Sequence, residues 1–468
     1  MGTKKKLPLV ENLEVTDIAA EGKSIARLDN MVVFIPGLVP GDIANVQISR
    51  RRKKYMEGYV VELKKKSANR NEPFCGHFGT CGGCKWQILP YEQQLLFKEK
   101  QVVDQLQRIG KTAIPAINPI IGSPQQQFYR NKLEFTYTAS RWLTAEEIKS
   151  GKEVEDKRGL GFHLPGKYNR VLNIDQCFLQ HDRSNQIRNA IREFTIKNNY
   201  EYNNPVTQTG FLRNLIIRNT EFGEWMVIVV FRYEDTKRIH RLMDMIRNDF
   251  PFITSLHYVI NSKLNDTIND LEIHLFSGRD HIFEELTGMK FKIGPRSFFQ
   301  TNTLQARKLY KIVLKFAELN DDELVYDLYT GTGTIAIFIA QHCKKVVGIE
   351  AVEAAIEDAR INSQINNIKN TVFTTGDIKE VLKSDFFAEY GKPDVIITDP
   401  PRSGMHKSVI EAITEASPKK IVYVSCNPAT QARDIQLMSR LYRVNMVQPL
   451  DMFPHTHHVE NVIRLDRI

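Results

Sequence analysis

The sequence lacks any apolar run that approaches the roughly 20 residues a membrane-spanning helix needs. Its basic start, residues 1–6, is not followed by a hydrophobic segment, so we expect no signal peptide. Internal repeats and low-complexity segments are also missing, which argues against a repeat protein. Of the 468 residues, 42% are hydrophobic and 25% charged, as in a globular protein. We therefore expect a cytoplasmic protein of about two to four domains, with no membrane association.

Positive charge is concentrated near the N-terminus. Residues 1–70 hold 14 Lys or Arg residues against 8 Asp or Glu, although the whole chain holds 64 against 55. The basic residues form three clusters, at residues 4–6, 50–54 and 64–66. One cluster alone is typical of a solvated surface. Three clusters in one predicted β-domain favour a module that binds a polyanion.

Within a predicted first domain of residues 1–70, residues 9–66 alternate with the period of β-strands. The expected strands are residues 13–18, 31–35, 43–48 and 58–63, separated by turn signals such as Pro36-Gly37. Short strands at this spacing predict a small closed barrel of OB type, a common platform for single-stranded RNA. Residues 21–27 and 33–37 resemble the TRAM domain, an RNA-binding barrel found on RNA-modifying enzymes.

Two further domains are predicted after the barrel. Residues 71–290 mix strands and helices, which predicts an α+β central domain that begins with a cysteine-rich loop. Within it, the many Gln, Lys and Glu residues of 91–109 predict an exposed amphipathic helix. From residue 291 to 468 the pattern becomes strand–helix–strand, which predicts a doubly wound, Rossmann-like sheet. The fold class is therefore α/β with two additional domains.

Four of the six cysteines form a candidate metal site. Cys75, Cys81 and Cys84 stand in a C-x5-C-x2-C pattern, and Cys177 is the plausible fourth ligand. A zinc ribbon would supply two C-x2-C knuckles, and this chain has one. Four unevenly spaced thiolates favour an iron–sulfur cluster over zinc. Cys343 follows an apolar helical stretch, so we interpret it as a core residue.

A nucleotide-binding loop is predicted at residues 330–334, where Thr-Gly-Thr-Gly-Thr follows a strand and precedes a helix. The glycines allow close approach of a ligand, and Glu350 at the end of the next strand can bind ribose hydroxyls. The same pattern also fits a dinucleotide. Two features favour S-adenosylmethionine over a dinucleotide. Asp327 in the leading strand offers a carboxylate for the cation of S-adenosylmethionine. The Asp399-Pro400-Pro401 turn ends a later strand, where a methyl-transfer substrate would bind.

A thiol and a carboxylate near the C-terminus suit methylation of a carbon atom. Cys426 follows a strand and precedes Asn427-Pro428, and Glu460 follows later. Carbon 5 of uracil becomes nucleophilic once a thiolate has added to carbon 6, and a base must then remove the carbon-5 proton. Cys426 is the candidate nucleophile, with its pKa lowered by cations such as Arg402. Glu460 is the candidate base, and His458 is the second.

Three motifs resemble the RNA uracil-5-methyltransferase family: Asp-Pro-Pro-Arg at 399–402, Ser-Cys-Asn-Pro at 425–428, and residues 453–460. With the TRAM-like barrel and the four cysteines, the chain resembles the branch that methylates 23S ribosomal RNA and carries a [4Fe-4S] cluster. The resemblance implies that Cys426 is the nucleophile and Glu460 the base. It further implies a set of S-adenosylmethionine-binding residues, namely Gln300, Tyr329, Glu350, Asp377 and Asp399. It implies cluster ligation by Cys75, Cys81, Cys84 and Cys177.

The resemblance implies an enzyme that binds RNA, most plausibly 23S ribosomal RNA, and we expect a monomer that does not bind DNA. Three alternatives stay open. The same chemistry could act on the T-loop of transfer RNA, a branch that commonly lacks the barrel and the cluster. The chain could be a non-enzymatic iron–sulfur protein that binds RNA, but its candidate catalytic residues are all present. A flavin- or NAD-linked oxidoreductase would need a second cofactor site, for which the sequence gives no sign.

Overall fold

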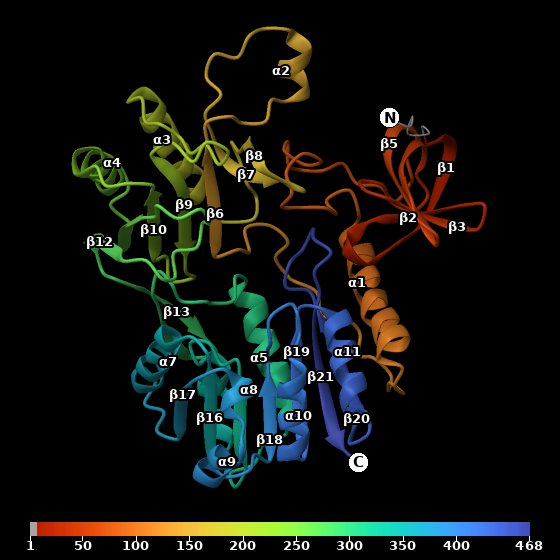
Figure 1. The fold of residues 1–468 in the computed structure, drawn as a ribbon, viewed down its shortest axis with the longest axis vertical. Coiled ribbons are helices and arrows are strands. Elements are labelled where there is room, and N and C mark those ends of the chain that lie inside the picture. The colour runs from red at the N-terminus through yellow and green to blue at the C-terminus, as the bar shows by residue number, and fades with distance from the viewer. Residues whose placement is uncertain (1–6) are drawn as a thin grey trace.

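The computed structural model describes residues 7–468, so the basic cluster predicted at residues 4–6 lies outside the described residues. The chain forms an N-terminal barrel, a central seven-stranded sheet and a C-terminal seven-stranded sheet (Figure 1). Among the helices described from residue 7 onward, none is both long enough and apolar enough to cross a membrane.

The N-terminal barrel is closed, with strand order β1-β2-β3-β5-β4. Its strands are β1 (Leu9–Ile18), β2 (Ser24–Leu28), β3 (Met31–Ile35), β4 (Ile43–Arg51) and β5 (Tyr55–Lys65), with the 3-10 turn η1 (Ala20–Gly22) after β1. The predicted barrel is confirmed, but β2 was missed. Its inward positions are Ser24 and Ala26, while Ile25 is only half-buried, so hydropathy does not mark its inner face.

The central sheet has the order β12-β11-β10-β9-β6-β7-β8. Its strands are β6 (Lys132–Thr138), β7 (Gly159–Leu164), β8 (Lys167–Asn173), β9 (Leu212–Asn219), β10 (Trp225–Phe231), β11 (Ser255–Ile260) and β12 (Ile273–Gly278). The helices of this part are α2 (Ala145–Ser150), α3 (Arg183–Lys197) and α4 (Thr236–Asp249). Helices α3 and α4 bury Ile187, Ile191 and Leu242 against the sheet. The predicted α+β character of this part is confirmed.

Helix α1 (Tyr91–Gln105) and the π-helical turn η2 (Leu106–Gly110) pack beside the C-terminal sheet (Figure 1). Val102 and Leu106 share a core cluster with the strands of that sheet. The prediction of an exposed helix is wrong for one face, because Gln94 and Lys98 are fully buried. Both polar side chains have buried partners, which composition alone does not reveal.

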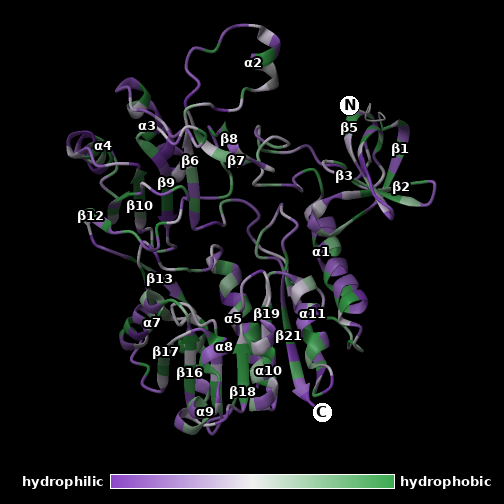
Figure 2. Ribbon diagram, viewed as in Figure 1, coloured by the Kyte–Doolittle hydropathy of each residue, from purple (hydrophilic) through white to green (hydrophobic). Residues whose placement is uncertain are grey.

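The C-terminal sheet has the order β17-β16-β15-β18-β19-β21-β20. Its strands are β15 (Leu324–Leu328), β16 (Lys345–Glu350), β17 (Thr371–Thr375), β18 (Val395–Thr398), β19 (Lys420–Ser425), β20 (Tyr442–Leu450) and β21 (Glu460–Arg467). The helices of this part are α5 (Thr303–Ala317), α6 (Thr334–Ile339), η3 (Ala340–His342), α7 (Glu353–Ile365), α8 (Ile378–Val381), α9 (Ser384–Tyr390), α10 (Lys407–Ala416) and α11 (Pro428–Met438). The first five strands are parallel and mostly hydrophobic (Figure 2), as burial on both faces requires. The predicted doubly wound sheet is confirmed.

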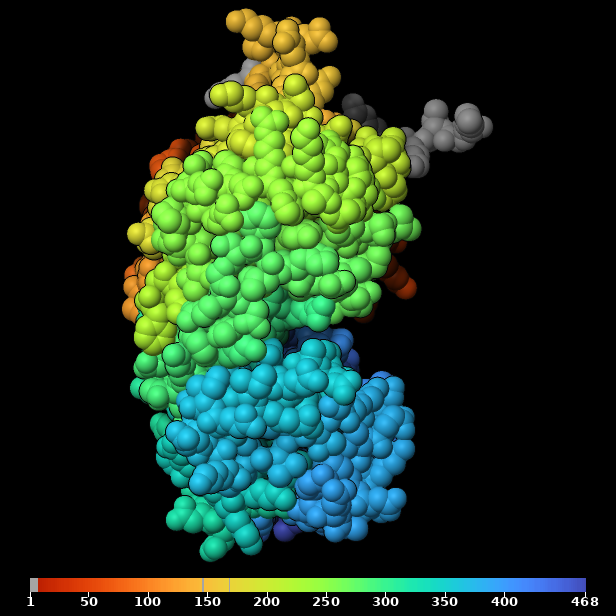
Figure 3. All heavy atoms as spheres, turned by 90° about the vertical axis from the view of Figure 1, so that its left-hand side faces the viewer, coloured from red at the N-terminus to blue at the C-terminus, as the bar shows by residue number. Residues whose placement is uncertain are grey.

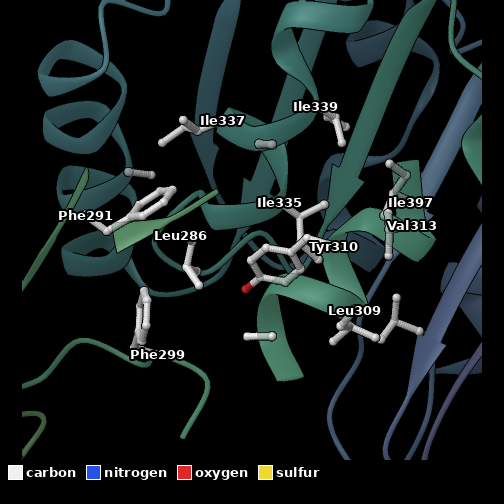
Figure 4. Packing of buried hydrophobic residues seen from close by; sticks show 14 of the residues in the cluster. Leu286, Phe291, Phe299, Leu309, Tyr310, Val313, Ile335, Ile337, Ile339 and Ile397 are labelled. Atoms are coloured by element: carbon white, nitrogen blue, oxygen red, sulfur yellow. The ribbon is translucent and has the colours of Figure 1, made fainter. Parts of the chain in front are cut away.

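The hairpin of β13 (Ile282–Leu286) and β14 (Met289–Ile293) shares a core with the C-terminal sheet. Leu286 and Phe291 from the hairpin lie near Tyr310 of α5 and Ile335 of α6 (Figure 4). In space-filling view the central part and the C-terminal part meet at a constriction (Figure 3). The boundaries 1–70, 71–290 and 291–468 stay a prediction.

Candidate active site

The candidate residues of the C-terminal part gather at one edge of its sheet. Tyr329, Asp399 and Cys426 each follow the carboxyl end of a parallel strand, namely β15, β18 and β19, and Glu350 ends β16. In open α/β sheets ligands bind outside the carboxyl ends of the strands. The strand order therefore places the glycine loop and the candidate nucleophile on the same side of the domain.

The glycine loop joins β15 to α6 through a tight, partly left-handed path. Gly331 and Gly333 have φ angles of 55° and 78°, and Tyr329 has a φ of 62°. A side chain at Gly333 would meet the Cβ atom of Ala359 at 3.0 Å and the ring of Phe373 at 3.1 Å. Only glycine fits there without strain or displacement of neighbours. A Cβ atom at Gly331 would meet no other atom within 4 Å, so a ligand can approach the backbone of the loop there.

Three carboxylates surround this loop: Asp327, Glu350 and Asp399. Glu350 accepts a hydrogen bond from the backbone N–H of Gly331 at 3.2 Å, and Asp327 accepts one from the hydroxyl of Thr330 at 2.6 Å. Burial raises the pKa of Asp327 to about 7, with further contributions from Asp399 and Glu350. Burial also raises the pKa of Asp399 to about 7. Within residues 7–468 none of the three forms an ion pair, so the site favours a cationic ligand.

Gln300, Tyr329 and Asp377 lie around the same loop. The segment that carries Gln300 is tied to it, because the hydroxyl of Thr332 donates to the carbonyl oxygen of Phe298 at 3.4 Å. Burial raises the pKa of Tyr329 to about 12, and the nearby carboxylates of Asp377 and Glu350 add to the shift. Asp377 is exposed and caps α8, with its carboxylate 3.0 Å from the ammonium group of Lys379. It therefore lies at the rim of the site.

Cys426 and Glu460 are brought together by an antiparallel pair of strands. The last pair of the ladder between β19 and β21 is Ser425 opposite Asn461, and Cys426 and Glu460 are the next positions beyond it. Glu460 lies near enough to raise the pKa of the Cys426 thiol. The Asp-Pro-Pro-Arg turn is fastened to the same loop, because Asn427 Nδ2 donates to the carbonyl oxygen of Arg402 at 3.1 Å. The sheet thus joins three motifs that are separated in the sequence.

The expectation that cations lower the pKa of Cys426 is wrong for this state of the protein. Burial raises the pKa of the Cys426 thiol to about 12, and the carboxylates of Glu460 and Asp399 contribute to the rise. Arg402 acts in the expected direction, but its effect is smaller. Glu460 is 6% exposed, and its burial, together with Asp399, raises its pKa to about 8. The thiol therefore needs a change in its surroundings before it ionises at neutral pH.

The two histidines near the site are neutral at physiological pH. Burial lowers the pKa of His457 to about 3 and that of His458 to about 4. A base with a pKa near 4 accepts protons poorly at neutral pH. Of the two candidates for the base, the electrostatics favour Glu460 over His458.

Sequence reasoning missed the residues that hold the segment leading into β21. The buried ammonium group of Lys98 on α1 lies 2.6 Å from Asp451 Oδ1 and donates to the carbonyl oxygen of Phe453 at 3.1 Å. The carbonyl oxygen of His455 accepts from the backbone N–H groups of Lys85 and Trp86, at 2.8 and 3.0 Å. These contacts join positions more than 350 residues apart, and no local pattern marks them.

The four candidate ligand cysteines line one cavity of about 200 Å³. Cys75, Cys81 and Cys84 come from the loop between β5 and α1, and Cys177 from the segment between β8 and α3. All four are free thiols, and burial raises the pKa of Cys81 to about 11 and that of Cys84 to about 12. Cys343 is buried in the core near α6, as interpreted from the sequence. Among residues 7–468, no three His, Cys, Asp or Glu side chains are grouped closely enough to hold a single metal ion.

Comparison with known proteins identifies the family. Residues 276–468 match the family model of tRNA (uracil-5-)-methyltransferases, and residues 10–61 match that of the TRAM domain. An RNA methyltransferase of Bacteroides thetaiotaomicron, itself uncharacterized, is 54% identical over 96% of this chain and 100% of its own length. An uncharacterized RNA methyltransferase of Porphyromonas gingivalis is 52% identical over 97% of this chain and 99% of its own. This chain belongs to the RNA uracil-5-methyltransferase family.

A solved member of this family extends the similarity to the whole fold. The Pyrococcus abyssi tRNA (uracil-54, C5)-methyltransferase, solved in complex with S-adenosyl-L-homocysteine, is 29% identical. The match covers 97% of this chain and 100% of that one, with a TM-score of 0.73. The predicted methyltransferase fold with its TRAM barrel is confirmed. Because a transfer-RNA enzyme matches along the full length, the overall architecture does not by itself distinguish ribosomal from transfer RNA as the substrate.

Proposed function

We propose that this protein methylates carbon 5 of a uracil base in RNA through a covalent bond between Cys426 and carbon 6 of that base. The observation that supports the proposal is the register of β19 and β21, whose last pair, Ser425 and Asn461, directly adjoins Cys426 and Glu460. Asp399 lies close enough to raise the pKa of both groups and also belongs to the acidic loop region. One edge of one sheet thus holds a nucleophile, a base and an anionic pocket.

The proposed reaction uses Cys426 and Glu460 in sequence. The Cys426 thiolate adds to carbon 6 and forms a carbon–sulfur bond, which leaves carbon 5 with enolate character. Carbon 5 then takes the methyl group of S-adenosylmethionine, whose methyl–sulfur bond breaks to leave S-adenosylhomocysteine, and Glu460 removes the proton from carbon 5. Elimination breaks the carbon–sulfur bond and restores the thiolate. A carboxylate with a pKa of about 8 is well matched to proton abstraction near neutral pH.

S-adenosylmethionine supplies the methyl group, and we propose that Gln300, Tyr329, Glu350, Asp377 and Asp399 bind it. The carboxylate of Glu350, fixed by backbone N–H groups at the end of β16, is placed to accept bonds from ribose hydroxyls. Asp327 and Asp399 supply negative charge near the sulfonium group. The same positive charge would offset the carboxylates that raise the pKa of Cys426 and thereby favour the thiolate.

We propose that Cys75, Cys81, Cys84 and Cys177 hold a [4Fe-4S] cluster. Four thiols from two segments line one cavity, and an all-thiolate donor set is typical of iron–sulfur clusters. The uneven spacing of the four cysteines, with one C-x2-C pair instead of the two of a zinc ribbon, favours the cluster over zinc.

For the substrate we propose a uridine of 23S ribosomal RNA. The set of four cysteines supports this choice through resemblance to the ribosomal branch. A uridine of transfer RNA is a second candidate, favoured by the full-length similarity to the Pyrococcus abyssi enzyme. The two candidates share the chemistry at Cys426 and differ only in the RNA that is presented.

The test uses anaerobically purified protein, methyl-labelled S-adenosylmethionine, and unmodified transcripts of 23S ribosomal RNA and transfer RNA. We expect label in 23S ribosomal RNA as 5-methyluridine. Label only in transfer RNA would keep the chemistry and overturn the proposed substrate. No label in either, from protein that binds S-adenosylmethionine, would overturn the proposal and favour a non-enzymatic iron–sulfur protein that binds RNA.

A further inference from the structure

A second polar cavity, of about 310 Å³, lies in the central part of the protein. It is bounded by the end of β6, the start of β9 at Arg213 and the residue after β10, Arg232. Arg218, near the other end of β9, donates to the carbonyl oxygen of Ser297 in the segment before the glycine loop. The five residue steps from Arg213 to Arg218 span roughly 16 Å of extended strand. The cavity is therefore at the end of the sheet remote from the glycine loop.

Arg232 carries a buried charge that has no anionic partner in the described part of the chain. It is 9% exposed, and its guanidinium donates only to the amide oxygens of Asn203 and Gln208. Its Nε–H has no hydrogen-bond acceptor. Burial and the neighbouring Arg213 lower its pKa. A buried cation without a counter-charge is costly, and a bound anion would remove that cost.

Arg213 adds a second positive charge to the cavity. It is 2% exposed and donates to the backbone carbonyls of Asn261, Lys263 and Asn265. Its one carboxylate partner is Asp266, at 2.8 Å, and that side chain is half-exposed. The wall thus holds two guanidinium groups against one carboxylate, which leaves the cavity positively charged.

The charge of the lining, rather than its unpaired atoms, argues for an anionic ligand. The Nε–H groups of Arg213 and Arg232 and the hydroxyl of Tyr137 form no hydrogen bond, but all three atoms are enclosed by protein. A ligand that balances the two guanidinium groups must carry negative charge and acceptor oxygens. Leu264, also in the lining, is 80% exposed, so the cavity reaches the surface. Its volume is at the lower end of the range for small-molecule sites, about 300–1,000 Å³, and suits a nucleotide-sized group.

We propose that this cavity binds a phosphate group, carried either by the backbone of RNA or by a free nucleotide. Arg232 is the principal charge partner, and Arg213 is the second. In the RNA case the proposal rests on the proposed function and adds a contact far from the modified base. In the nucleotide case it is independent of the methylation chemistry.

The test measures phosphate binding in the absence of S-adenosylmethionine, so its outcome does not depend on methyl transfer. The probes are inorganic phosphate, uridine monophosphate and a short single-stranded RNA, read by thermal unfolding and calorimetry. Arg232→Gln removes the charge but keeps an amide at the cavity. Arg241→Gln, at an exposed position on α4, is the charge-matched control. We expect phosphate to raise the melting temperature of the wild type and of the control, but not of Arg232→Gln.

A second variant keeps the proposal testable if Arg232→Gln folds poorly. Gln208→Glu places a carboxylate beside Arg232, whose guanidinium donates to Gln208 Oε1 at 3.2 Å, so it should not destabilise the free protein. It should nevertheless weaken phosphate binding several-fold.

The salt dependence of RNA binding then separates the two sources of phosphate. If RNA supplies the phosphate, Arg232→Gln should reduce the slope of log affinity against log salt by about 0.7. If a free nucleotide supplies it, uridine monophosphate should bind more tightly than inorganic phosphate and the RNA slope should not change. A wild type that responds to neither phosphate nor uridine monophosphate, with an RNA slope unaffected by Arg232→Gln, would overturn the proposal.

Discussion

The ammonium group of Lys98 lies 2.6 Å from Oδ1 of Asp451, and both side chains are completely buried. Asp451 also accepts hydrogen bonds from the hydroxyl of Tyr91 at 2.8 Å and from the backbone N–H of Phe453 at 2.9 Å. Burial lowers the pKa of Lys98, while Asp451 acts against that shift. The pair ties helix α1 to the segment that leads into Glu460.

Lys98→Met should destabilise the protein strongly, because it leaves the carboxylate of Asp451 buried without its cation. The expected loss is about 3–5 kcal/mol of unfolding free energy. Lys100→Met on the same helix is the control, since Lys100 is exposed and its ion pairs contribute at most about 1 kcal/mol. Denaturant unfolding measures both. Equal stability of the two variants would show that the buried pair contributes nothing specific.

Replacing the proposed nucleophile and replacing the proposed base should have different effects. Cys426→Ala should lower turnover by at least about a thousandfold and abolish covalent capture of RNA, while S-adenosylmethionine still binds. Glu460→Gln should instead accumulate the protein–RNA adduct, because the carbon-5 proton is not removed. Denaturing gels with labelled RNA reveal the adduct, and Cys343→Ala is the control cysteine. Normal turnover by Glu460→Gln would refute the assignment of the base.

Binding of S-adenosylmethionine should release protons near pH 6.5. The pKa values of Asp327 and Asp399 are about 7, so both carboxyls are largely protonated at that pH. A bound cation favours their ionised forms, so the protons leave. Calorimetry in buffers of different ionisation enthalpy measures the release. Asp327→Asn should reduce it by roughly half, because one of the two carboxyls is gone, whereas the exposed Asp385→Asn should not. Proton uptake on binding would contradict this account.

The rate of adduct breakdown should rise with pH until Glu460 is ionised. Below its pKa of about 8, each unit of pH should increase the ionised fraction about tenfold. Single-turnover experiments between pH 6 and 9 that follow loss of the adduct measure this step. A rate that stays constant from pH 6 to 8 would exclude Glu460 as the titrating base.

The raised pKa of Glu460 should also make the stability of the folded protein depend on pH. The folded state holds a proton on Glu460 that the unfolded chain gives up near pH 4, so folding takes up a proton between about pH 4 and 8. The contribution of Glu460 to stability therefore falls as pH rises through that window. Glu460→Gln should make the stability of the free protein less dependent on pH.

Substituting a cluster cysteine should remove iron from the protein. Cys84→Ser should lower the iron and sulfide content of anaerobically purified protein and weaken its visible absorption. Cys343→Ser is the matched control, because that thiol is buried elsewhere in the core. Elemental analysis measures the effect. Stoichiometric zinc in the wild type, or full iron retention in Cys84→Ser, would refute the proposed cluster.

The sequence predicts those parts of the fold where short-range patterns reflect burial. Alternation marks β1, β3, β4 and β5, and the glycine loop marks the turn after β15. It does not mark β2, because the inner face of that strand is formed by small side chains. The pairing of Cys426 with Glu460 depends on β21 running antiparallel between β19 and β20, which is settled by tertiary packing. Arg232 follows an apolar strand, and nothing local predicts that its charge is buried.

The carbonyl oxygen of His455 accepts two backbone hydrogen bonds from residues 85 and 86, immediately after Cys84. His455 itself has a φ of 64°, a conformation that a non-glycine residue keeps only when its surroundings enforce it. Five residues later the chain reaches Glu460. Damage to the cysteine loop would therefore also shift Glu460, so a protein with a damaged loop would lose the proposed base before it unfolds.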